Sequence, residues 1–187
     1  MKILFYDMGS YTYRDFIYYL EQAGHHCRTV YYHFPDKFED EFFENRFAKY
    51  LSESSYDAVV SVNFFPLVAK LCKKHSIKYL SWCYDSPLEE RLKDYFSYET
   101  NYIFLFDRIE VESYRAEGYS QVFHLPLAVN TGRLDALAFT PAQAASYRAD
   151  VSFVGRLYDS PLEALLYPAD DYCKGFVEGL IQAQLRV

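Results

Sequence analysis

Residues 58–83 read AVVSVNFFPLVAKLCKKHSIKYLSWC, and this stretch decides the fold class. The apolar runs Ala58–Val62 and Lys78–Cys83 predict two short strands, and the segment from about Leu67 to His75 between them predicts a helix. A strand, a helix and a second strand form a crossover unit, which joins parallel strands of one sheet. Near-continuous apolar runs are typical of parallel strands that helices cover on both faces.

The same alternation extends in both directions from this unit. Thr12, with Asp15 three residues later, has the pattern of a helix start, and Gly24 ends that helix. The predicted strands outside the unit are Ile3–Tyr6, Cys27–Tyr32, Tyr102–Phe106 and Gln121–Leu125, and the predicted helices are Lys37–Ser52 and Arg108–Glu117. We therefore predict a Rossmann-like α/β domain with a parallel sheet flanked by helices, and take 3-2-1-4-5-6 as a working strand order.

The composition of the sequence changes from Asn130 onward. Residues 130–148 contain Ala, Thr and Gln, which suggests a linker with a short helix. A new strand is predicted at Asp150–Gly155 and a last helix at about Asp170–Leu185. We expect one domain over residues 1–147, and over residues 148–187 the beginning of a second, incomplete α/β domain with a terminal helix, because so few elements cannot close a core.

One hexapeptide, YDSPLE, occurs at Tyr84–Glu89 and again at Tyr158–Glu163. In each copy Ser can cap a helix, Pro can be its first residue and Glu can complete a capping box. Shared helix-start chemistry explains the repeat, and so does a pair of loops that face one ligand cleft. Both explanations stay open at this stage.

Composition excludes several classes of function. The net charge is −7 and no basic block is present, which argues against nucleic-acid binding. No apolar segment has the length of a signal-peptide core or a membrane span, so we expect a cytoplasmic protein. The four cysteines form no C-x-x-C pair, so we expect reduced thiols. The histidines lack ligand spacing, so no metal is expected, and most of the 20 Tyr and 16 Phe should fill helix–sheet interfaces.

Familiar catalytic motifs are missing from the sequence. It contains no G-x-G-x-x-G, no P-loop and no G-x-S-x-G elbow. In parallel α/β sheets, ligands bind beyond the carboxyl ends of the strands, where helix N-termini favour anions. The loops at those ends supply the candidate binding residues Gly9, Ser10, Asn63, Ser86 and Asp107, and Asp85 lies in the same loop as Ser86.

Two segments are informative together: His124–Asn130, and the later Asp150–Leu157, which contains FVGRL. This pair resembles the passage between domains of the two-Rossmann-domain (GT-B) glycosyltransferases. Further segments join it in a wider pattern: Ile3–Asp7, Trp82–Pro87, Phe106–Arg108, Leu125–Asn130, Val151–Gly155 and Tyr172–Gln184. In their order and spacing they resemble more closely the spore-maturation CgeB-type glycosyltransferase-like family.

The resemblance implies transfer of a sugar from a nucleotide-diphosphate donor to an acceptor hydroxyl. The N-terminal domain would hold the acceptor, with Asn130 at the cleft and Asp85 as the candidate catalytic carboxylate. Gly155 and Arg156 would meet the donor diphosphate. This architecture requires no cofactor or metal. Since most donor contacts would lie in the second domain, we expect this chain alone to be inactive as a transferase.

A different class of function remains open. The chain could be a non-enzymatic α/β module that binds a small molecule or a partner protein through the same cleft. The apolar residues Leu127, Val129, Val151 and Phe153 would then offer a homodimer surface, left by the missing domain.

Overall fold

The protein is described by a computed structural model that covers residues 1–155 and 162–186. It divides into two compact units, Met1–Ala136 and Leu137–Val187, which are described separately. The sequence pattern places the boundary near residue 147, about ten residues after this division.

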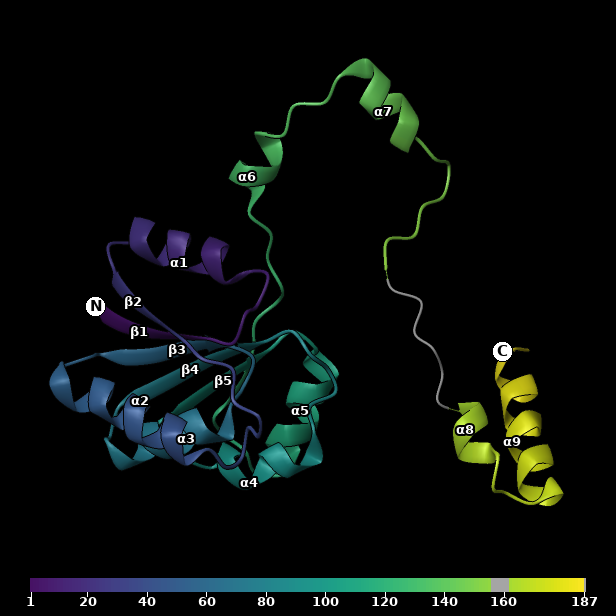
Figure 1. Cartoon of the computed structure of the whole chain (residues 1–187), viewed down its shortest axis with the longest axis horizontal. Helices are drawn as coiled ribbons and strands as arrows, with labels where there is room; N and C mark the ends of the chain where they lie inside the picture. The colour runs from purple at the N-terminus through teal and green to yellow at the C-terminus, as the bar shows by residue number, and fades with distance from the viewer. Residues whose placement is uncertain (156–161, 187) are drawn as a thin grey trace. The chain divides into compact units, whose positions relative to one another are not determined.

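The first unit is built on one six-stranded sheet in which every neighbouring pair of strands is parallel. This confirms the predicted Rossmann-like α/β class (Figure 1). The strands are β1 (Lys2–Asp7), β2 (His26–Tyr31), β3 (Ala58–Val62), β4 (Lys78–Cys83), β5 (Asn101–Leu105) and β6 (Val122–His124).

The strand order is 2-1-3-4-5-6, so the working order 3-2-1-4-5-6 is wrong. β3 pairs directly with β1, with Leu4 opposite Val59. The point at which the strand order reverses therefore lies between β1 and β3. Hydrophobic periodicity identifies strands but carries no information about which strand lies beside which.

The helices of this unit cover the two faces of the sheet unequally. They are α1 (Tyr13–Gln22), α2 (Glu41–Glu53), α3 (Pro66–Lys74), α4 (Lys93–Phe96), α5 (Arg108–Ala116) and α6 (Thr131–Asp135), with a 3-10 turn, η1, at Glu90–Leu92. Crossovers are right-handed, and only the β1-to-β2 connection runs toward the β2 edge. The crossover helix α1 therefore lies on one face, and α2–α5 lie on the other (Figure 1).

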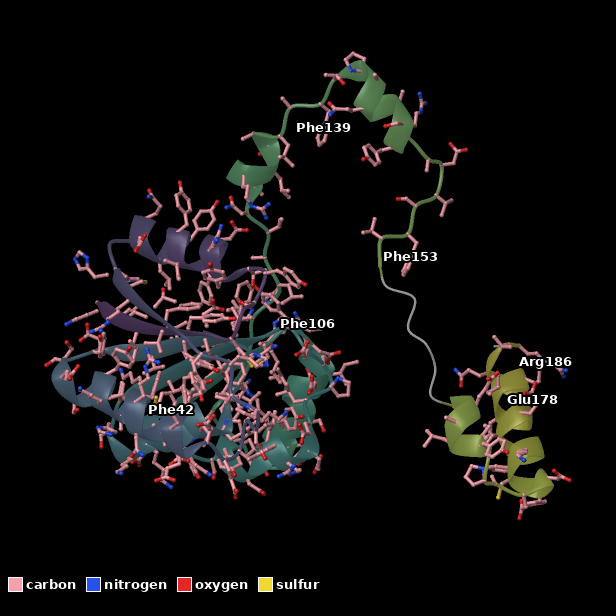
Figure 2. All side chains as sticks on the ribbon, in the orientation of Figure 1. Phe42, Phe106, Phe139, Phe153, Glu178 and Arg186 are labelled. Carbon is pink, nitrogen blue, oxygen red and sulfur yellow. The ribbon has the colours of Figure 1, made fainter. Side chains whose placement is uncertain are left out.

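Aromatic rings dominate the core beneath α2–α5. Tyr6 stacks on Phe34 and makes edge contacts with Phe43, Phe47 and Phe65. These side chains are all buried, as expected for rings between a sheet and its helices. Phe42, labelled in Figure 2, is the exception on α2 and is 62% exposed.

The opposite face is only partly covered within Met1–Ala136. Beneath α1, Phe5 and Val60 are buried against Phe16 and Ile17. On β4 and β5, by contrast, burial alternates along the strand, whereas all five residues of β3 are buried. The expectation of strands apolar and covered on both faces is correct for β3 and wrong for β4 and β5. The half-buried side chains on this face include Leu80, Trp82, Tyr102, Phe104 and Phe123.

Two predicted helix starts are wrong in detail. Thr12 precedes α1, but its side chain makes no capping hydrogen bond. Tyr84–Glu89 does not begin a helix at Ser86; helical structure starts later, at Glu90. Ser86 is unavailable as a cap because its hydroxyl bonds to Glu110 instead. Of the second copy of the hexapeptide, residues 158–161 lie outside the described residues, while Leu162 and Glu163 are the first two residues of a helix that ends at Leu166.

The second unit contains the helices α7 (Pro141–Tyr147), α8 (Leu162–Leu166) and α9 (Asp171–Gln184). No described residue of this unit is buried. The strand predicted at Asp150–Gly155 does not form in the described segment that ends at Gly155. An isolated strand needs a neighbour for its backbone hydrogen bonds, and none is paired to it there.

The cysteines are all free thiols. Cys72 and Cys83 are buried, Cys27 is half-buried and Cys173 is exposed. Burial raises the pKa of Cys83 to about 12, so this thiol stays protonated. Among the described residues, no helix is both long enough and apolar enough to span a membrane.

Candidate functional site

A pocket of about 610 Å³ lies at the carboxyl edge of the sheet, beside the point where the strand order reverses. Because β1, β3 and β4 are parallel neighbours, the loops that follow them lie at the same edge. Its lining comes from four segments: Met8; Phe34 to Phe38; Asn63 to Phe65; and Asp85 with Pro87, Leu88, Glu89, Arg91 and Leu92. The pocket therefore brings together Asn63 and Asp85, two of the residues predicted from sequence.

Asn63 organises the two loops that form the floor of this pocket. Its Nδ2 donates to Asp85 Oδ2 at 2.8 Å, and its Oδ1 accepts from the Tyr84 N–H at 2.8 Å. The residue has a φ of 64°, in the left-handed region that Asn tolerates better than other side chains with a Cβ. The Asn63 amide thus orients the Asp85 carboxylate, and Asp85 is otherwise exposed to solvent.

A buried polar network beneath the pocket fixes the turn at Asn63. The Tyr79 hydroxyl accepts from the Phe65 N–H at 3.0 Å and lies 2.7 Å from Ser61 Oγ. Since Ser61 Oγ donates to the Asn63 carbonyl at 2.6 Å, Tyr79 is the donor to Ser61. Burial raises the pKa of Tyr79 far above its usual range, which keeps this donor protonated. The sequence analysis missed both Ser61 and Tyr79, because a polar atom inside an apolar strand gives no sign of its partner.

Glu110 on α5 holds the loop that follows β4. Its Oε2 accepts from Ser86 Oγ at 2.8 Å, and its Oε1 accepts from the Leu88 N–H at 2.9 Å and from the Tyr114 hydroxyl at 3.0 Å. Ser86 therefore anchors the loop and is not one of the pocket-lining residues. Glu110 was not among the predicted site residues, since it lies in an ordinary helical pattern.

The loop after β1 is closed by its own carboxylate. Asp7 is 4% exposed, and its Oδ1 accepts from the N–H groups of Gly9 at 2.8 Å and Ser10 at 3.1 Å. Gly9 has a φ of 96°, which a residue with a Cβ rarely adopts. The Gly9 and Ser10 N–H groups are therefore engaged by Asp7 in this structure, and a ligand oxygen would compete with a carboxylate for them.

Two other predicted residues serve as helix caps. Asp107 accepts from the N–H groups of Ile109 and Glu110 at the start of α5. Asn130 caps α6 by accepting from the Arg133 N–H, and it lines a second pocket beside α1. The structure thus keeps Asp107 and Asn130 out of the lining of the 610 Å³ pocket.

The residues that line the 610 Å³ pocket carry a net negative charge. The lining carries the carboxylates of Asp36, Asp85 and Glu89 and the cations Lys37 and Arg91, which leaves one excess negative charge. Lys37 pairs with Glu89, and the Arg91 guanidinium lies 3.9 Å from the centroid of the Phe38 ring. The excess negative charge repels a diphosphate, so this pocket disfavours one.

Two residues, Gly155 and Arg156, were predicted from sequence to meet a diphosphate. Gly155 belongs to the second unit, where a Cβ added to it would lie 2.5 Å from the Phe153 ring. Arg156 lies outside the described residues. Within the described ranges, no three His, Cys, Asp or Glu side chains gather in a way that could hold a metal ion.

Comparison with protein-family models, curated proteins and solved structures gave no match to this chain. The functional argument therefore rests on the geometry of the site and on the sequence.

Proposed function

We propose that this chain provides the acceptor-binding part of a glycosyltransferase that moves a sugar from a nucleotide-diphosphate donor to an acceptor hydroxyl. The observation that carries the proposal is the Asn63–Asp85 pair, with Asp85 Oδ2 held at 2.8 Å on the lining of a 610 Å³ pocket. Sugar transfer needs a proton acceptor at the attacking hydroxyl, and an oriented carboxylate can fill that role.

The chemistry assigned to each residue follows from its position. Asp85 would accept the proton as the acceptor oxygen attacks the donor sugar, and Asn63 would orient the carboxylate. Met8 and Phe64 would give the acceptor ring apolar contacts, since both line the pocket. The diphosphate would leave with a negative charge, which requires cations or N–H groups. The excess negative charge of this pocket favours placing the diphosphate elsewhere.

Acceptor binding is the first test. Neutral saccharides such as methyl glucoside and maltose are titrated into the isotope-labelled chain and followed by amide NMR. The proposal expects saturable shifts at Asn63–Phe65 and Asp85–Leu88, which belong to the loops of this pocket and not to the pocket beside α1, and no comparable shifts there with UDP. If no saccharide moves these resonances, or if UDP moves them more strongly, acceptor binding at this pocket is wrong.

Transfer is the second test, measured with radiolabelled nucleotide sugars and with a donor-binding domain present, because this chain alone is expected to be inactive. Asp85→Asn should lower kcat by about 10²–10⁴-fold, the usual contribution of a general base. The matched control is Asp57→Asn, which alters a carboxylate that binds the Lys2 N–H at the opposite edge of the sheet. An Asp85→Asn variant that transfers sugar at the wild-type rate would remove Asp85 from the mechanism.

A non-enzymatic binding module is the second candidate function. It is favoured by the exposed apolar side chains of Leu127 (47%) and Val129 (60%) in the first unit and of Val151 (91%) and Phe153 (81%) in the second. Phe153 is labelled in Figure 2. Sedimentation of the full chain at several concentrations tests the dimer that this candidate includes. A mass that stays that of a monomer would count against it.

A further inference from the structure

A second pocket, of about 400 Å³, lies beside α1. It is lined by Thr12, Asp15, Phe16, Tyr19, Trp82, Tyr84, Ala128, Val129, Asn130 and Arg133. None of these residues lines the 610 Å³ pocket. The volume is near the lower end of the ~300–1,000 Å³ found for ligand sites, so it suits a ligand of about one ring.

Aromatic rings form one wall of this pocket. Trp82 makes edge contacts with Phe16 at 5.4 Å and with Tyr84 at 5.2 Å between ring centroids. These contacts hold the three rings in fixed positions at the end of β4 and on α1. Ring faces carry a partial negative charge and attract the polarised C–H groups of an apolar ligand face.

Hydrogen-bonding side chains form the other wall and tie the segment after β6 to α1. Asn130 Nδ2 donates to Asp15 Oδ1 at 2.9 Å, and the Tyr19 hydroxyl donates to Asn130 Oδ1 at 3.0 Å. Arg133 donates through Nη2 to Asp15 Oδ2 at 2.9 Å and through Nε to both carboxylate oxygens at 3.2 Å. This cluster, which we call the Asp15 latch, comprises Asp15, Tyr19, Asn130 and Arg133. It gives the pocket its second wall.

The latch leaves the pocket without net charge. Among the described residues that line the pocket, Asp15 is the only acid and Arg133 the only base, and they form an ion pair. The buried hydroxyl oxygen of Thr12, which also lines the pocket, has no hydrogen-bond partner in the part of the chain described. An unpartnered buried hydroxyl is costly, so a ligand hydroxyl that bonded to Thr12 would be favoured.

We propose that this pocket is a second binding site, for a neutral pyranose ring. The apolar face of the sugar would lie on the aromatic wall, and its hydroxyls would bond to Thr12 and the Asp15 latch. The proposal does not depend on the proposed transfer function, because it concerns different residues and involves no reaction.

Trp82 provides the measurement, since it is the only tryptophan in the sequence and lines the pocket. The full chain is titrated with methyl glucoside, methyl galactoside, methyl mannoside and N-acetylglucosamine, and Trp82 emission is recorded. At about 10 mM, a site with a dissociation constant near 1 mM is about nine-tenths occupied. The proposal expects a saturable change with at least one neutral pyranoside and at least 10-fold weaker binding of glucuronate, which carries a charge.

Variants separate the pocket from general effects on the fold. Arg133→Gln should weaken the bound pyranoside at least 10-fold, because it opens the latch that forms one wall. The matched control, Arg14→Gln, alters an exposed arginine of the same region that bonds only to Tyr13 in the described chain, and should bind as the wild type does.

Three outcomes would overturn the proposal. The first is an absence of any Trp82 change with the four pyranosides on the wild-type chain, a result that no folding defect of a variant can cause. The second is an equal affinity for uridine or glucuronate. The third is unchanged binding in Arg133→Gln. Since none of these measurements involves transfer or the Asn63–Asp85 pair, a failure here is distinct from a failure of the proposed function.

Discussion

The two units contain similar helix-start signals but differ in what their helices cover. Asp107 caps α5 in the first unit, and Asp170 caps α9 in the second with a bond to the Cys173 N–H. Thr140 and Gln143 even form a complete capping box in the second unit. Yet the first unit has a large buried core, while no described residue of the second is buried. Capping starts a helix, but burial of an apolar face supplies most of its stability.

The largest expected effect on the free energy of unfolding comes from a buried ring of the first unit. Phe47 is fully buried and packs on Tyr6 and Phe43. Phe47→Ala should lower the free energy of unfolding of the first unit by about 3–5 kcal/mol, the usual cost of such a cavity. Urea unfolding followed by Trp82 fluorescence measures it.

The matched control is Phe176→Ala in α9, where the ring is 60% exposed. It should change the same free energy by no more than about 0.5 kcal/mol. A loss above ~1 kcal/mol would break the comparison, because it would mean that α9 stabilises the first unit.

The next effect concerns the two caps. Asp107→Ala should lower the free energy of unfolding by about 1 kcal/mol, since it frees the Ile109 and Glu110 N–H groups, and Asp107→Asn should restore most of it. Asp170→Ala should reduce helical circular dichroism without moving the Trp82 unfolding midpoint. Equal shifts of that midpoint by Asp107→Ala and Asp170→Ala would contradict the distinction between the units.

The smallest effect is a pH dependence within the first unit. Hydrogen bonds from Asn130 and Arg133 lower the pKa of Asp15 below its ordinary value of 3.8. A carboxyl with a lowered folded-state pKa stabilises the fold above its unfolded pKa, and this contribution is lost as pH falls through the folded pKa. Carboxyl NMR should show the Asp15 pKa rising toward 3.8 in Asn130→Ala and in Arg133→Gln. An unchanged pKa in both would mean that the Asp15 latch does not form in solution.

The strand positions were predictable because each strand contains an apolar run of its own. Ala58–Val62 and Lys78–Cys83 match β3 and β4 residue for residue. The strand predicted at Asp150–Gly155 does not form, because a similar apolar run there has no neighbouring strand to pair with in the described chain. The hydrophobic pattern of a segment indicates its propensity to form a strand. Whether the strand forms depends on whether the fold places another strand beside it.

The sequence predicted at which edge of the sheet the candidate site lies, but not which residues contact one another there. Asn63 and Asp85 follow neighbouring strands, so sequence placed them at one edge, and the structure joins them at 2.8 Å. Ser86 and Asp107 also lie at this edge of the sheet, but Ser86 bonds to Glu110 and Asp107 caps the start of α5. Glu110 and Tyr79 were missed because their roles depend on partners 22 and 14 residues away along the chain.

The strand order also bears on how the sheet assembles on the ribosome. After β3 has paired with β1, each of β4, β5 and β6 joins the exposed edge left by the strand synthesised before it. Only β2 joins at the other side, and it emerges before β3 does. Every strand from β3 onward therefore meets a ready template as it leaves the exit tunnel, which limits the time that a hydrophobic strand edge waits for its partner during synthesis.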